Sequence, residues 1–137
     1  MREIKFRGKD DQGQWNYGNL VRYTEDDGEQ VTCIVSTARN EISAEVVFVP
    51  VDENSVQQFT CLHDKNGNEI YEGDILELVV TYKGKPVKSP RIRKVVWKNS
   101  GFCIVNKHND CVCERSVTCE DLEYTVIGNI YDNHDLI

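Results

Sequence analysis

The residues best suited to metal chemistry are four cysteines and one histidine in the last third of the chain: Cys103, His108, Cys111, Cys113 and Cys119. Zinc prefers four soft ligands and is commonly held by tight Cys-x-x-Cys turns. Cys111-Val112-Cys113 has only one intervening residue, which in a strand would point both thiols to one face, and no second tight pair occurs. Together with Cys33 and Cys61, these cysteines are expected to be free thiols in a reducing cytosol, with no metal, no disulfide and no cofactor.

Glu72-Gly73-Asp74 places two carboxylates close together, and general acid–base catalysis could use such a pair in a cleft. A structural role is the favoured interpretation, because glycine permits an unusual φ and aspartate can accept from nearby backbone. His63 lies beside a predicted turn, and His134 lies near the end of the chain. No nucleophile elbow, phosphate-binding loop or dinucleotide fingerprint occurs, so we predict no catalytic residues and no enzymatic activity.

Charge is distributed unevenly along the chain. The net charge is −7, yet residues 83–98 contain seven bases and no acid, which leaves nine bases and 23 acids, or −14, elsewhere. The candidate interaction surface consists of these bases and one aromatic residue: Lys83, Lys85, Lys88, Arg91, Arg93, Lys94, Trp97 and Lys98. An acidic surface on a neighbouring subunit would attract it, which favours a homo-oligomer. Nucleic-acid binding through backbone charge and base stacking is the alternative, which the acidic total disfavours.

The elements that would position these residues begin with a hairpin in residues 51–80. Asn66-Gly67 separates two segments of strand character and predicts a type I′ turn, which needs φ > 0 at both central residues. After this turn, apolar residues at every second position predict a strand with one face on a core: Leu76, Leu78, Val80 and Tyr82.

Further strands are predicted at residues 3–7, 15–23, 31–36, 42–49, 92–98, 102–105 and 124–131. In the first of these, Ile4 and Phe6 share one face, and the other face carries Glu3, Lys5 and Arg7. Asp52 is expected to cap one helical turn over Glu53 to Gln57, and Thr118 a second turn at residues 120–122. The sequence therefore predicts a mostly β protein, with an N-terminal β region over residues 1–50 packed on a second part over residues 51–137 as one compact unit.

Three separate segments resemble the YopX-type proteins that phages and prophages encode. These segments are DKNGNEIYEGDI at residues 64–75, the opening Arg2–Gly8 with Trp15–Gly18, and the closing Val126–Asn133. The resemblance implies an SH3-like small barrel in the C-terminal part and a phage accessory protein of no established activity. The chain departs from the family pattern at Cys61, where the resemblance would place glycine, so the backbone there is expected to be less permissive.

Composition limits the location and the partners of the protein. The longest apolar run, at residues 46–51, is far too short to span a bilayer, so no membrane contact is expected. The N-terminus shows no charged-then-apolar export pattern, which favours the cytoplasm of a bacterial host. The expected function is that of a non-enzymatic accessory protein that binds other copies of itself, or a host or phage protein.

Overall fold

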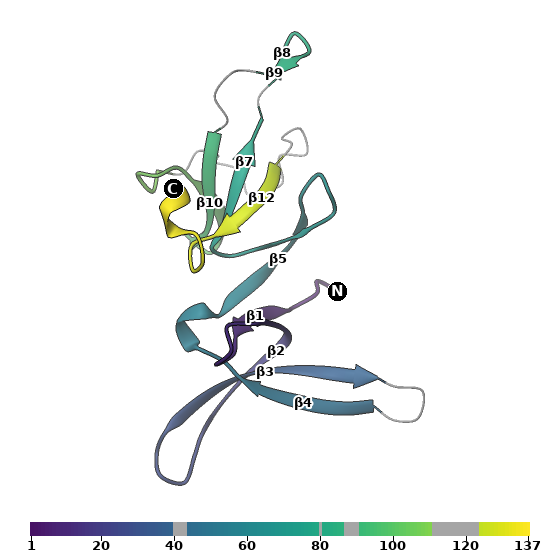
Figure 1. Ribbon diagram of the computed structural model, residues 1–137, viewed down its shortest axis with the longest axis vertical. Coiled ribbons are helices and arrows are strands. Elements are labelled where there is room, and N and C mark those ends of the chain that lie inside the picture. Colours follow the sequence, from purple (N-terminus) through teal and green to yellow (C-terminus); the bar gives the residue numbers. More distant parts are fainter. Residues whose placement is uncertain (40–43, 80, 87–90, 111–123) are drawn as a thin grey trace. The chain divides into compact units, whose positions relative to one another are not determined.

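The computed structural model describes residues 1–39, 44–79, 81–86, 91–110 and 124–137, and these residues form antiparallel sheets with only two short 3-10 turns (Figure 1). The chain divides into two units, Met1–Phe59 and Thr60–Ile137. The division falls inside a strand rather than near Pro50, because the first residues of that strand pair with the N-terminal strand. Residues 51–59 therefore belong to the first unit. Among the described residues, no helix has the length and apolar character needed to cross a bilayer.

The first unit is built from consecutive neighbouring strands: β1 (Phe6–Lys9), β2 (Trp15–Thr24), β3 (Gln30–Arg39), β4 (Ala44–Pro50) and the start of β5 (Gln57–His63). Their order in the sheet is β4-β3-β2-β1-β5, so β4 lies at one edge. The interior is small, with Cys33 and Ile34 each 1% exposed. Gly18 allows β2 to approach β3, because a Cβ there would lie 2.1 Å from the carbonyl oxygen of Val35.

The second unit contains the end of β5 with its partner β6, a four-stranded sheet of order β11-β10-β7-β12, the two-stranded sheet β8-β9 and one 3-10 turn. Its elements are β6 (Glu69–Tyr71), β7 (Asp74–Leu78), β8 (Thr81–Tyr82), β9 (Lys85–Pro86), β10 (Arg91–Lys98), β11 (Gly101–Val105), β12 (Tyr124–Asn129) and a 3-10 turn, η2 (His134–Leu136). The described strands do not close into a barrel. The mostly β prediction is confirmed, whereas the SH3-like barrel is not; the turn predicted at residues 120–122 lies outside the described residues.

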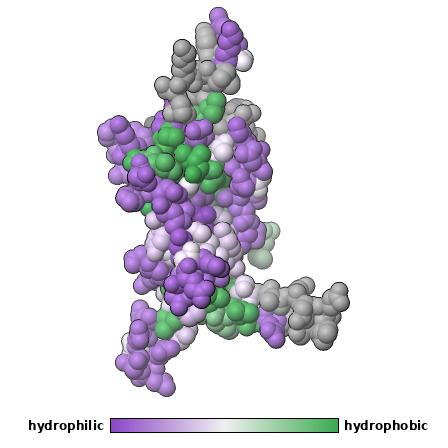
Figure 2. Space-filling view, in the orientation of Figure 1, coloured by the Kyte–Doolittle hydropathy of each residue, from purple (hydrophilic) through white to green (hydrophobic). Residues whose placement is uncertain are grey.

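The core of the second unit forms on one face of β7, β10 and β11. Its buried side chains are Ile70, Leu76, Leu78, Val95, Ile104 and Tyr124, with Leu62, Phe102 and Val126 packed against them. The predicted alternation is thus confirmed at Leu76 and Leu78. Ile75, on the opposite face, is also 0% exposed, so β7 is covered on both faces. Figure 2 shows that hydrophilic residues occupy most of the visible surface around the apolar ones.

The hairpin in residues 57–71 forms where it was predicted, but its turn is not type I′. The N–H of Gly67 donates to the carbonyl of Asp64 at 3.0 Å, and within this loop only Gly67, at 83°, has a positive φ. This is a type I turn followed by a left-handed glycine. Two consecutive left-handed residues do occur at Asn99 and Ser100, with φ of 52° and 68°, between the paired residues Lys98 and Gly101. The type I′ geometry therefore joins β10 to β11.

The same five-residue frame, with an Asp or Asn at its first position, recurs in three of the described loops, at Asp10–Gln14, Asp64–Asn68 and Asn106–Asp110; Glu25–Glu29 makes the same two backbone bonds without such a first residue. In each loop the first N–H donates to the fifth carbonyl and the fourth N–H donates to the first carbonyl. The first side chain accepts from the third and fifth N–H groups at 2.8–3.1 Å. The fourth residue is left-handed, with φ of 77°, 83° and 63°. An initial Asp or Asn and a left-handed fourth residue thus set each reversal locally.

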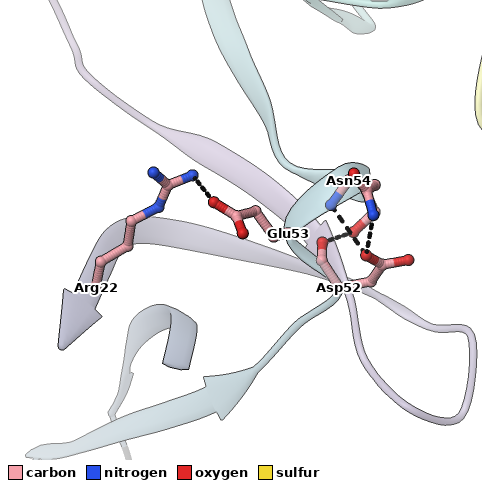
Figure 3. Close-up of polar contacts among 5 residues, drawn as sticks. Arg22, Asp52, Glu53 and Asn54 are labelled. Carbon is pink, nitrogen blue, oxygen red and sulfur yellow. Dashed lines mark hydrogen bonds and ion pairs between the residues drawn. The ribbon is translucent and has the colours of Figure 1, made fainter. Parts of the chain in front are cut away.

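The predicted helical turn after Asp52 is a 3-10 turn, η1 (Glu53–Ser55) (Figure 3). The Asp52 carboxylate accepts from the N–H of Asn54 at 2.9 Å, as an N-cap should. The buried hydroxyl of Ser55 donates to the carbonyl of Asp52 at 2.6 Å and accepts from the N–H of Lys9 at 2.7 Å. The turn is therefore fixed to β1. An exposed ion pair of 2.6 Å joins Glu53 to Arg22 of β2 and adds little in solvent.

Candidate functional site

The predicted interaction surface is divided between two structural elements of the second unit. Lys83 and Lys85 are exposed in the β8–β9 hairpin, where Lys83 has a φ of 50° at the turn. The other described members lie on β10, and Lys88 lies outside the described residues. The described cations of residues 83–98 thus belong to a short hairpin, β8–β9, and to β10 of the four-stranded sheet.

Within β10, the alternation of the strand separates the remaining members into two groups. β10 is paired with β11 on one side and β7 on the other. Arg93 lies opposite Leu76, so Arg91, Arg93 and Trp97 project to the same face as the core. Lys94 and Lys98 project to the other face. The structure therefore places the two arginines and the tryptophan along one face of β10 and the two lysines on the other.

Trp97 of the second unit is a half-exposed aromatic residue, at 51%. Its ring meets that of Phe102 edge to face, with 4.9 Å between centroids. Phe102 in turn packs against the core. The tryptophan is thereby held in place while half of its surface stays open, and Arg93, whose guanidinium donates to the carbonyl of Ile92 at 2.8 Å, lies on the same strand face.

A second group of cations, which was not predicted from the sequence, lies on β1. Arg7 is only 8% exposed, and its Nε donates to the Gln57 side chain at 2.7 Å. The Trp15 ring lies 4.8 Å from the Arg7 guanidinium and 5.3 Å from the Lys9 ammonium. The position of Trp15 directly after the Asp10–Gln14 reversal is the signal that could have revealed this contact, because the hairpin places Trp15 opposite Lys9. These cations cover aromatic surface within the first unit.

The predicted carboxylate pair forms part of the turn between β6 and β7. Asp74 is 0% exposed, and its carboxylate accepts from the N–H of Tyr71 at 2.7 Å. Gly73 has a φ of 81°; its N–H donates to Val95 and its carbonyl accepts from Ile130, both at 2.8 Å. These contacts give Asp74 and Gly73 a structural role in joining β7 to its neighbours.

The three described cysteines, Cys33, Cys61 and Cys103, are not joined in disulfides. Cys111, Cys113 and Cys119 lie outside the described residues, so the expected absence of zinc stays a prediction. His108 lies exposed in the 106–110 loop. The exposed carboxylates of Glu25, Asp27 and Glu29 come within 4.8 Å of one another, but they share a single hairpin loop and nothing else there points to an ion.

Cys61 occupies a backbone conformation that favours glycine, with a φ of 68°. An L-residue in this region costs about 1–2 kcal/mol of backbone strain. Glycine would remove this strain, but it loses more conformational entropy on folding, which offsets part of the gain. Cys61→Gly is therefore expected to raise the free energy of unfolding by about 0.5–1 kcal/mol, measured by urea denaturation. Cys103→Gly is the matched control, because Cys103 is buried at an ordinary φ and its loss should destabilise the protein. Equal destabilisation by both changes would contradict the strain at Cys61.

The antiparallel strands and short self-contained loops define a small all-β protein of two units. The chain belongs to the YopX family, since the family model described as YopX protein matches residues 5–137. It is similar to the crystal structure of protein EF1440 from Enterococcus faecalis, with 25% identity, a TM-score of 0.60 and 99% of each chain covered. No curated protein matches the sequence. The family predicted from three segments is confirmed over nearly the whole chain.

Proposed function

We propose that the protein is a non-enzymatic phage or prophage accessory protein that acts through protein contacts in the bacterial cytoplasm, as a homo-oligomer. The observation that carries this proposal is the grouping of Arg91, Arg93 and half-exposed Trp97 on one face of β10. Arginine and tryptophan are enriched at the energetic centres of protein interfaces. An acidic surface would complement this group. Residues outside 83–98 carry a net charge of −14, so each neighbouring copy of the chain offers acidic residues.

The second unit is also proposed to be an SH3-like module. β7 pairs with both β10 and β12, and the register of β12 shifts between Val126 and Gly128. Such irregularities bend a strand and increase its twist, which small barrels require. A host or phage protein with an acidic surface would fit the same arginine and tryptophan group.

Binding of single-stranded nucleic acid is the second candidate function. The same group favours it, because a half-exposed indole ring can stack on a base while neighbouring guanidinium groups contact phosphates. The acidic total charge opposes it, since nucleic-acid affinity depends largely on neutralising phosphates.

Two double variants of β10 separate these functions. Arg91→Ala/Arg93→Ala removes two positive charges from the face that carries Trp97, and Lys94→Ala/Lys98→Ala removes two from the opposite face. Only the arginine pair is expected to lower the mass measured by light scattering, with self-association weakened about tenfold or more. Nucleic-acid affinity is expected to be negligible for all three proteins. Tight, salt-sensitive binding of DNA or RNA by the wild type, with unchanged mass in both variants, would instead establish the nucleic-acid function.

A further inference from the structure

The edge strand β4 has an apolar segment that is open on both faces. Val46 is 60% exposed, Val47 38% and Phe48 57%, although neighbouring residues of a strand point to opposite faces. β4 is the last strand in the order of its sheet, so among the described strands it pairs with β3 alone. Figure 2 shows apolar residues along the β3–β4 hairpin, next to its grey tip. Among the residues that the structure describes, the strand thus has no partner at one edge and is exposed at Val46 to Phe48 on both faces.

The outward-facing backbone groups of β4 can be identified from its register. The N–H of Val51 donates to the carbonyl of Thr32, which continues the ladder in which Pro50 lies opposite Cys33. Because hydrogen-bonded and non-bonded pairs alternate in an antiparallel ladder, Val47 and Val49 direct their N–H and C=O groups towards β3. Val46 and Phe48 direct theirs towards the open edge. Pro50, which has no N–H, falls at an outward position and ends the row of donors.

Devices that normally prevent edge pairing are sparse on β4. Natural edge strands are protected by lysines, central prolines, bulges or very short length. β4 has seven residues and an unbroken register with β3, its proline is the last residue, and its one charged residue is Glu45. An edge of this kind accepts another strand readily.

We propose that β4 pairs antiparallel with β4 of a second copy of the chain, across a two-fold axis at Val47. In this register Val46 of one copy lies opposite Phe48 of the other, so both outward-facing residues of each copy form hydrogen-bonded pairs. Glu45 then lies opposite Val49 of the second copy, and the two acids do not meet. One symmetric contact closes both open edges and sets the apolar side chains of the two copies beside one another. This inference rests on the proposed homo-oligomer and identifies a second surface for it.

The test is to change Val46, whose N–H and side chain both face away from the β3 ladder. Val46→Lys places a charge in the contact, and Val46→Pro removes one outward donor without removing a hydrogen bond to β3. Both are expected to weaken self-association about tenfold or more in analytical ultracentrifugation, with unchanged melting at high dilution. Ile127→Lys is the matched control, because Ile127 is a 37% exposed apolar residue on β12, the edge strand of the other sheet. It is expected to leave the mass unchanged.

Amide hydrogen exchange of the wild type provides a test that needs no variant. In the paired state the N–H groups of Val46 and Phe48 should be protected as well as those of Val47 and Val49. On dilution only the first two should lose their protection, because the other two remain bonded to β3. Protection that does not change with concentration would overturn the inference.

The outcomes separate this inference from the proposed function. If the mass responds to Arg91→Ala/Arg93→Ala but not to Val46→Lys, the homo-oligomer stands and β4 pairing is wrong. If it responds to Val46→Lys but not to the arginine pair, β4 pairing stands and the basic face of β10 is not the contact. A wild type that is monomeric at every concentration overturns both.

Discussion

Asp64→Ala is expected to lower the free energy of unfolding by about 3 kcal/mol, because one buried carboxylate serves several donors. It accepts from the N–H groups of Asn66 and Asn68 at 2.8 and 2.9 Å and from the Asn68 side chain at 3.1 Å. It also accepts from the N–H of Val126 at 3.0 Å, which ties the loop to β12. Chemical denaturation would measure the loss. Asp10→Ala is the control, since Asp10 occupies the same place in an exposed loop, and its smaller effect should leave the second unit intact.

The same carboxylate should make stability depend on acid. Burial raises the pKa of Asp64, but the hydrogen bonds from Val126, Asn68 and Asn66 outweigh it and lower the pKa below the ordinary 3.8. A lowered folded pKa contributes stability that is fully present above the ordinary value and is lost as the pH falls towards the folded one. The difference between wild type and Asp64→Asn should therefore shrink on acidification below about pH 4. A difference independent of pH would contradict an ionised Asp64.

Gly67→Val is expected to cost about 1–3 kcal/mol, measured by thermal melting. The reason is backbone conformation alone, because Gly67 has a φ of 83° and a Cβ there would meet no atom within 4 Å. Although the turn is not the predicted type I′, valine is disfavoured at this position in either turn, because Gly67 is left-handed in both.

Gly101→Val is the control for this conformational cost. A Cβ at Gly101 also meets nothing within 4 Å, but Gly101 lies at an ordinary φ at the start of β11, where valine suits a strand. It should be neutral or slightly stabilising. If both valine variants melt alike, the left-handed conformation of Gly67 does not limit stability.

The position of the central hairpin could be predicted from sequence, but its turn type could not. Asn-Gly indicates a type I′ turn when two residues form the loop, and here the loop has five because Asp64 binds the backbone of Asn66 and Asn68. Loop length depends on which strand residues pair, and this in turn depends on the core. Asn99-Ser100 carries the type I′ geometry without the favoured glycine.

The basic segment shows a similar limit of sequence reasoning. Counting charges identified a segment with seven cations, but a count does not show to which face of a strand each side chain projects. Neighbouring residues of a strand point to opposite faces, so Arg93 and Lys94 of β10 lie on opposite faces of the sheet. The cluster on β1 was missed because alternation places Arg7 on the face opposite Phe6 without showing that contacts with Gln57 and Trp15 bury it. Both outcomes depended on tertiary pairing rather than on local pattern.

The order of strands has a consequence for how the chain folds as it leaves the ribosome. β1 to β4 are each adjacent in space to the next in sequence, and the one distant partner in the first unit, the start of β5 against β1, is complete by Phe59. The first unit can fold while later residues are still being added. The second unit has to wait, because β7 pairs with β12 and Tyr124 completes its core. A chain stalled before residue 124 would thus have a folded first unit and a second unit in which one edge of β7 lacks its partner strand.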